Sequence, residues 1–107
     1  MSIQKSYTAL KGAVTKSFQK ELSPTDAIEL LRTGHQRFNE NTPLKRSRIA
    51  LLEDASEGQF PYAAVLGCID SRVPIEEVFD ATIGDLFVAR VAGNTVNPDI
   101  LGSLEYA

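Results

Sequence analysis

Three chemically capable side chains, Cys68, Asp70 and Arg72, lie at alternating positions just after an apolar run, residues 63–67. Side chains two residues apart on an extended backbone point the same way, so this spacing predicts one small patch that holds all three. A cysteine thiolate is a strong zinc ligand, and a carboxylate such as Asp70 could ligate the metal or accept a hydrogen bond from hydroxide. Arg72 offers a fork of donors that could pair with Asp70 and orient its carboxylate.

Each of these residues also has an ordinary structural explanation. A free cysteine after an apolar strand is commonly a small core residue. The pair Asp70-Ser71 is typical of a turn or a helix cap, and Arg72 is typical of a protein surface. Taken singly, the residues favour these structural roles, and the choice depends on the wider segment.

Three blocks of sequence, in order, carry a resemblance to a known family. They are Cys68-Ile69-Asp70-Ser71-Arg72-Val73-Pro74, Gly84-Asp85-Leu86-Phe87-Val88 and Ala92-Gly93-Asn94. Their order and spacing closely resemble the first half of the β-class carbonic anhydrases, and residues 100–107 resemble the helix that follows. The resemblance runs from about residue 24 to residue 107.

The resemblance implies specific roles at the matching positions. Cys68 falls on the family's first zinc ligand, Asp70 on the carboxylate that gates the metal and orients the nucleophile, and Arg72 on that carboxylate's partner. We therefore expect Asp70 and Arg72 to be catalytic, Cys68 and Asp70 to face the metal, and Zn²⁺ to be the cofactor. The implied reaction is that of a lyase, the reversible hydration of carbon dioxide to bicarbonate by zinc-bound hydroxide.

The chain departs from the family at the remaining ligands. The family completes its site with a His-x-x-Cys block beyond the last helix, whereas this chain has one cysteine and one histidine, His35. His35 lies upstream in a predicted helix without a ligand-spaced companion, so it is interpreted as a helical residue. A catalytic zinc site normally has three protein ligands. We therefore expect a truncated, N-terminal portion of the protein that binds zinc weakly and is weakly active or inactive.

Two other functions stay open. A zinc hydrolase for carbonyl sulfide or carbon disulfide would use the same first-half motif on another small linear substrate. A non-catalytic fragment that associates with itself would explain the incomplete ligand set. Assays of carbon dioxide hydration and of sulfide release distinguish the two enzymes. Self-association without metal would favour the fragment.

Composition excludes several classes of partner. The 107 residues are 43% hydrophobic with a net charge of −3, which predicts globular material and gives no reason to expect nucleic-acid binding. The basic run at residues 45–48 is interpreted as a solvated loop or a helix start. No segment has the apolar length of a signal or a membrane span, so no membrane association is expected. A single cysteine excludes an intrachain disulfide and favours a cytoplasmic location.

Residues 1–22 are predicted to form an amphipathic N-terminal arm helix. Its apolar residues recur at steps of three and four: Ile3, Tyr7, Leu10, Val14, Phe18 and Leu22. In the resembling family such helices commonly extend over a partner subunit, and packing on the same chain is the alternative.

Residues 23–107 are predicted to form an incomplete α/β domain, with N-terminal helices followed by a partial parallel β-sheet with crossover helices. Ser23 and Pro24 begin a helix that ends near residues 39–43, and a short helix follows around residues 49–52. Strands at 62–69 and 86–91 flank a helical stretch at 75–79, and Asn97-Pro98 opens the last helix.

Other features of this domain bear on its assembly and its site. Two strands leave unpaired edges, so we expect a homo-oligomer, either a dimer or a domain-swapped form. Gly93 and Asn94 are predicted to need unusual backbone angles. Val73 and Phe87 are candidates for an apolar pocket, with core packing as the alternative.

Overall fold

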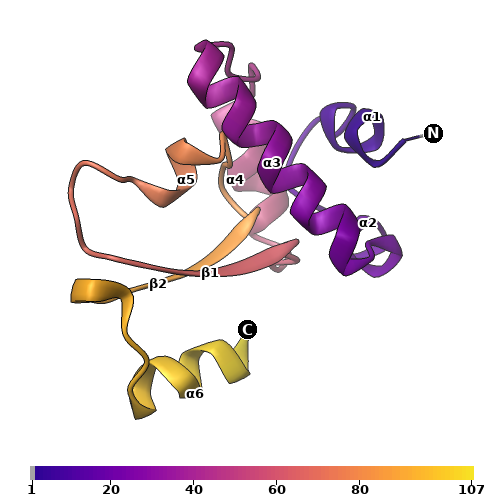
Figure 1. The fold of residues 1–107 in the computed structure, drawn as a ribbon. Helices are drawn as coiled ribbons and strands as arrows, with labels where there is room; N and C mark the ends of the chain where they lie inside the picture. Colours follow the sequence, from indigo (N-terminus) through magenta and orange to yellow (C-terminus); the bar gives the residue numbers. More distant parts are fainter. Residues whose placement is uncertain (1) are drawn as a thin grey trace.

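The computed structural model describes residues 2–107, and its elements confirm the predicted α/β class (Figure 1). In chain order they are α1 (Ile3–Thr8), α2 (Lys16–Glu21), α3 (Pro24–Glu40), α4 (Arg48–Ala55), β1 (Ala63–Gly67), α5 (Ile75–Val78), β2 (Leu86–Arg90), the 3₁₀ turn η1 (Ala92–Asn94) and α6 (Pro98–Tyr106). Figure 1 shows α6 below the strands and the other α-helices above them.

The two strands pair in parallel, as the long connection between them predicts. The register runs from Ala63 opposite Leu86 to Gly67 opposite Arg90. Both strands are shorter than the predicted ranges 62–69 and 86–91, and β1 ends before Cys68. The carboxyl ends of both strands meet at one edge of the sheet, where the chain continues into the candidate site.

Helix α3 begins and ends as its sequence predicts. The Ser23 side chain accepts a hydrogen bond from the Asp26 amide, the Asp26 side chain accepts one from the Ser23 amide, and Pro24 occupies the first helical position. At the other end Asn41 takes a left-handed conformation with φ of 56°, which stops the helix.

The N-terminal stripe is divided between two helices, so the prediction of one continuous helix over residues 1–22 is wrong. The chain leaves α1 after Thr8, and the Thr15 side chain caps α2. The apolar spacing nevertheless identified residues of the core. Tyr7, Val14 and Phe18 are buried in one cluster with Leu30 of α3 and Tyr62 next to β1, so these members of the stripe cover their own chain.

Asp85 lies at the centre of a buried polar contact. Its side chain is 2% exposed and its Oδ2 accepts hydrogen bonds from the Tyr7 hydroxyl at 2.5 Å and from the Thr82 amide at 2.9 Å. Its carbonyl accepts from the Tyr62 amide at 2.8 Å. Asp85 therefore joins α1 to the start of β2.

The basic run at residues 45–48 was predicted to be a solvated loop or a helix start, and the structure supports the second alternative. Ser47 caps α4, which confirms the helix start. The Arg46 side chain, however, is 19% exposed and its Nη2 donates to the Tyr7 hydroxyl at 3.0 Å and to the Asp80 carbonyl at 2.9 Å. Arg46 is thus a packed residue rather than a solvated one.

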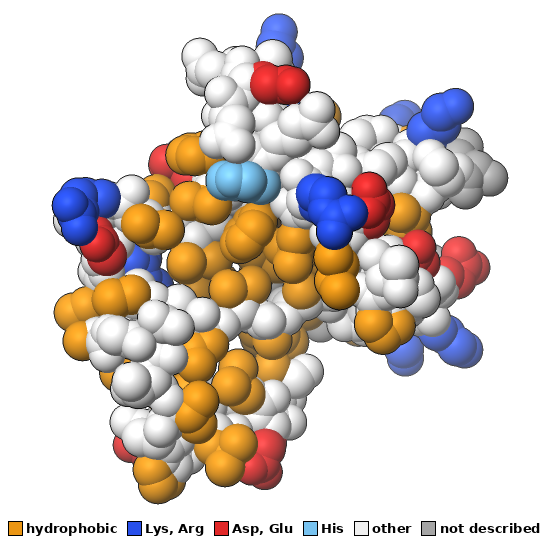
Figure 2. Space-filling model, viewed as in Figure 1, with side chains coloured by type: hydrophobic (Ala, Val, Ile, Leu, Met, Phe, Trp, Pro, Cys, Tyr) orange, Lys and Arg blue, Asp and Glu red, His pale blue; other side chains and the backbone are white. Residues whose placement is uncertain are grey.

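Hydrophobic side chains remain visible at the surface. In Figure 2 they gather across the middle of the face, over the strands and between α3 and α6. Exposed large apolar residues across the described chain include Ile28, Phe38, Ile49, Leu52, Ile69, Val73, Val96 and Leu101. None of the helices within residues 2–107 combines the length and apolar character needed to cross a bilayer.

Candidate functional site

The predicted trio lies in an irregular loop that begins where β1 ends. We call residues 68–73 the site loop. Ser71 and Arg72 form its turn, and the Val73 amide donates to the Asp70 carbonyl at 3.1 Å. Loops at the carboxyl ends of parallel strands are the usual place for ligand-binding groups in open α/β sheets.

Asp70 and Arg72 form the pair that their spacing predicts. Arg72 Nε donates to Asp70 Oδ1 at 3.0 Å and Nη2 donates to Oδ2 at 2.8 Å, so the guanidinium holds both carboxylate oxygens. The Arg72 amide also donates to Oδ1 at 2.9 Å. Arg72 therefore fixes the orientation of the Asp70 carboxylate while its own side chain is 86% exposed.

Cys68 contacts the turn that follows β2. The Gly93 amide donates to Cys68 Sγ at 3.3 Å. Gly93 has φ of 73° and Asn94 has φ of 41°, which confirms the prediction of unusual backbone angles at both positions. The left-handed turn at Gly93 brings a main-chain donor to the sulfur.

A second arginine, Arg90, which sequence reasoning missed, holds the backbone of the site loop. Arg90 Nε donates to the Cys68 carbonyl at 2.6 Å, and Arg90 Nη2 donates to the Asp70 carbonyl at 2.9 Å. The only signal that could have found it is the strand pairing, because Arg90 is the residue opposite Gly67 in the register.

The electrostatics of the site favour ionised forms. Hydrogen bonds from backbone amides, led by that of Gly93, lower the pKa of the Cys68 thiol. The Arg72 side chain and then its amide lower the pKa of Asp70, with a further contribution from the charge of Arg90. The Asp70 hydrogen bond in turn raises the pKa of Arg72. A thiol with a lowered pKa thus lies on the same loop as a carboxylate with a lowered pKa.

Cys68 and Asp70 are the candidate metal-facing side chains in this loop. Within the described part of the chain, no group of three or more His, Cys, Asp or Glu side chains is arranged to hold a metal ion. His35 is packed between α3 and α5, where its Nδ1 donates to the Val78 carbonyl at 2.9 Å and its ring stacks on Phe38. It is the helical residue that the sequence indicated.

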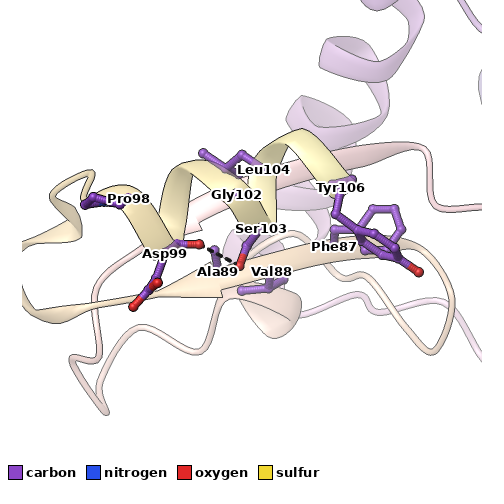
Figure 3. A pocket seen from close by; sticks show the side chains of 10 residues that line it. Phe87, Val88, Ala89, Pro98, Asp99, Gly102, Ser103, Leu104 and Tyr106 are labelled. Atoms are coloured by element: carbon purple, nitrogen blue, oxygen red, sulfur yellow. Dashed lines mark hydrogen bonds between the residues drawn. The ribbon is translucent and has the colours of Figure 1, made fainter.

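A cavity of about 580 Å³ lies between β2 and α6, apart from the site loop (Figure 3). Phe87 and Tyr106 lie edge to face across it, with ring centroids 6.2 Å apart. Phe87 lines this cavity, which is apart from the site loop, so an apolar pocket at the site itself stays a prediction. Val73 does not line this cavity and is 43% exposed.

Comparison with known proteins gives consistent matches. A family model described as carbonic anhydrase matches residues 63–107. Carbonic anhydrase 2 of Mycobacterium tuberculosis is 40% identical over 86 residues, and a carbonic anhydrase of Mycolicibacterium smegmatis is 42% identical over 86 residues. Each alignment covers 79% of this chain and 42% of the relative, so the chain spans less than half the length of these proteins.

The similarity extends to the fold of a solved structure. The structure of the β-carbonic anhydrase CcaA is 35% identical with a TM-score of 0.54, over 75% of this chain and 41% of that one. The helices and the small parallel sheet therefore match part of a β-carbonic anhydrase fold. The resemblance indicated by the three sequence blocks is confirmed.

Proposed function

Because this chain carries part of the β-class carbonic anhydrase sequence and fold, we propose that it contributes to the reversible hydration of carbon dioxide to bicarbonate. The observation that carries the proposal is the loop at the end of β1, where Cys68 and the Asp70–Arg72 pair occur together at the sheet edge. The similar mycobacterial proteins are carbonic anhydrases, which supports the reaction class.

Zinc is the proposed cofactor, and the donors on the chain fit it in part. The Cys68 thiol, whose pKa is lowered, is the kind of ligand that zinc prefers, and the Asp70 carboxylate is a second possible ligand. When held by a full ligand set, zinc lowers the pKa of bound water. The described residues bring no third donor to this loop, so we expect them to hold zinc weakly by themselves.

Asp70 and Arg72 have the proposed catalytic roles. Arg72 holds the carboxylate ionised and oriented, through one hydrogen bond to each oxygen. A carboxylate oxygen can accept more than one hydrogen bond, so Asp70 retains acceptor capacity for a proton-bearing nucleophile. In this proposal Asp70 orients that nucleophile and Arg72 acts through Asp70.

The test combines metal content with activity. Elemental analysis gives zinc per chain after chelator washing, and stopped-flow with a pH indicator measures carbon dioxide hydration with and without added Zn²⁺. We expect less than one retained zinc per chain, and any zinc-dependent hydration to be lost in Cys68→Ser. Arg32→Lys is the matched control, because Arg32 pairs only with Glu29 on the exposed side of α3.

Three outcomes would count against this proposal. Zinc retention that is unchanged in Cys68→Ser would contradict the ligand assignment. Hydration without any dependence on zinc would contradict the cofactor. Release of sulfide from carbonyl sulfide without hydration of carbon dioxide would favour the alternative hydrolase.

We also propose that copies of the chain associate. Support comes from the two-stranded sheet, which leaves strand edges unpaired, and from the apolar side chains visible over the strands in Figure 2. Sedimentation velocity tests the proposal, and a monodisperse monomer that unfolds cooperatively would contradict it. A cytoplasmic location, expected from the single cysteine, is likewise a proposal, which cell fractionation tests.

A further inference from the structure

The site loop lies outside the helices and strands, so few backbone hydrogen bonds hold it in place. β1 ends at Gly67, and the last rung between the two chain segments is the hydrogen bond from the Val91 amide to the Gly67 carbonyl at 3.1 Å. Beyond it, the bond from the Val73 amide to the Asp70 carbonyl closes the turn. The carbonyl of Cys68 has no such backbone partner among the bonds of the described chain, so an outside group, either a side chain or solvent, satisfies it.

Arg90 is that outside group. It is the last residue of β2, and the register places it opposite Gly67, directly beside the start of the loop. Its guanidinium donates to the carbonyls of Cys68 at 2.6 Å and Asp70 at 2.9 Å. One planar guanidinium therefore bridges the main chain at the two positions whose side chains carry the proposed chemistry.

The positions of the two carbonyls have a geometric consequence. On an extended backbone, carbonyls two residues apart point to the same side, and side chains two residues apart share a face. A fork that holds the carbonyls of Cys68 and Asp70 on one side therefore favours the extended path between them. On such a path the thiol and the carboxylate would share a face.

We propose that Arg90 is a positioning residue, which sets the path of the site loop and thereby the placement of Cys68 relative to Asp70. This inference rests on the function proposed for the loop. Arg90 differs from Arg72, which lies inside the loop and binds the Asp70 carboxylate rather than the backbone. Lysine cannot replace Arg90, because a single ammonium lacks the planar fork that reaches two carbonyls at once.

Amide hydrogen exchange by NMR on the metal-free, ¹⁵N-labelled chain tests the proposal. Two amides report on the loop: Gly93, which donates to Cys68 Sγ, and Arg72, which donates to Asp70 Oδ1. In Arg90→Lys we expect both to exchange about tenfold faster or more, and the Gly93 amide proton to shift. The Tyr62 amide, which donates to the Asp85 carbonyl at the far end of the strands, should not change. Arg32→Lys is the matched control.

A second measurement needs no substitution. In the unmodified chain the Arg90 Nε proton should exchange slowly and show scalar coupling to the carbonyl carbon of Cys68. If the Tyr62 amide also loses protection in Arg90→Lys, the variant has lost its fold. The exchange and coupling of the Arg90 Nε proton in the unmodified chain then test the proposal alone. Unchanged Gly93 and Arg72 amides in a folded Arg90→Lys, or a freely exchanging Arg90 Nε proton, would overturn the proposal. Neither readout uses substrate or zinc, so failure of the proposed function would leave this result intact.

Discussion

The environment of Cys68 is made by main-chain donors rather than by a charged side chain. The Gly93 amide lies 3.3 Å from the sulfur, and amides of Asp70, Ile69 and Asn94 also favour the thiolate. Gly93 adopts φ of 73°, a region that glycine occupies without the clash that a Cβ would introduce. A glycine at this position therefore supplies both the turn and the donor that prepares the thiol for ionisation.

Alkylation of Cys68 by iodoacetamide should reveal this lowered pKa. The thiolate is the reactive form, so the rate should reach half its maximum at a pH below the ordinary thiol value of about 8.5. Cys68 is the only cysteine in the chain, so the loss of free thiol reports on this residue alone. The same chain unfolded in urea is the control and should titrate at the ordinary value. Identical midpoints in the folded and unfolded chain would contradict the role of the backbone donors.

At this scale the sequence predicted the contacts that are local and missed those that are not. Asp70 and Arg72 are two residues apart, so their side chains can pair whatever the rest of the fold does. Arg90 lies 22 residues after Cys68 in the sequence. Its acceptors are main-chain carbonyls, which every residue has, so residue types alone cannot identify this contact. Only the register of the two strands brings Arg90 to that loop.

At the scale of elements, one turn of α3 holds the end of the crossover. His35 Nδ1 donates to the Val78 carbonyl at 2.9 Å, and Arg37 Nε donates to Asp80 Oδ2 at 2.6 Å. Between these contacts the backbones approach so closely that a Cβ on Gly34 would lie 1.9 Å from the Phe79 carbonyl oxygen. The crossover that begins with the site loop is thus fixed by α3 at the point where α5 ends.

Gly34→Ala should therefore destabilise the fold. An alanine favours the helix by up to about 1 kcal/mol, but the clash with a backbone atom forces a shift that costs about 1–3 kcal/mol. We expect a net fall in the free energy of unfolding, measured by urea titration with circular dichroism. Gly102→Ala in α6 is the matched control, because a Cβ there has no atom within 4 Å. It should be neutral or stabilising by up to about 1 kcal/mol, and an equal response in the two variants would refute the close approach.

The helix boundaries show which sequence signals are sufficient to predict where a helix begins or ends. The start of α3 was predicted because Ser23 and Pro24 each act within one turn of the backbone. The break between α1 and α2 was not predicted, because the apolar stripe continues through it at helical spacing. The turn keeps Val14 buried with Tyr7, so periodicity alone could not distinguish one long helix from two short ones.

At the scale of the whole molecule, buried polar groups join distant parts of the chain. Tyr7 of α1 donates to Asp85, at the start of β2, and accepts from Arg46, which precedes α4. Arg46 and Arg37 of α3 both bind Asp80, whose side chain is 10% exposed. This network had no signal in the sequence, because its members are separated by up to 78 residues and become neighbours only when the core forms.

Asp85 gives this network a predictable dependence on pH. Burial raises the pKa of Asp85, although hydrogen bonds from Tyr7 and Thr82 and the charge of Arg46 act in the opposite direction, while the charge of Asp80 raises it further. The folded pKa therefore lies above the unfolded value of about 3.9. As the pH rises from the unfolded pKa of Asp85 towards its folded pKa, the carboxyl ionises in the unfolded chain first. The free energy of unfolding therefore falls over this pH range.

Asp85→Asn removes this titration and keeps an oxygen that can accept from Tyr7 and Thr82. The free energy of unfolding of the wild type minus that of the variant should be largest near pH 4 and decrease as the pH rises towards 7. Urea titrations at several pH values measure this difference, and Asp54→Asn, at an exposed position, controls for the loss of one negative charge. A difference that stays constant or grows with pH would show that the Tyr7 and Arg46 contacts outweigh burial, and that the network stabilises the ionised form of Asp85.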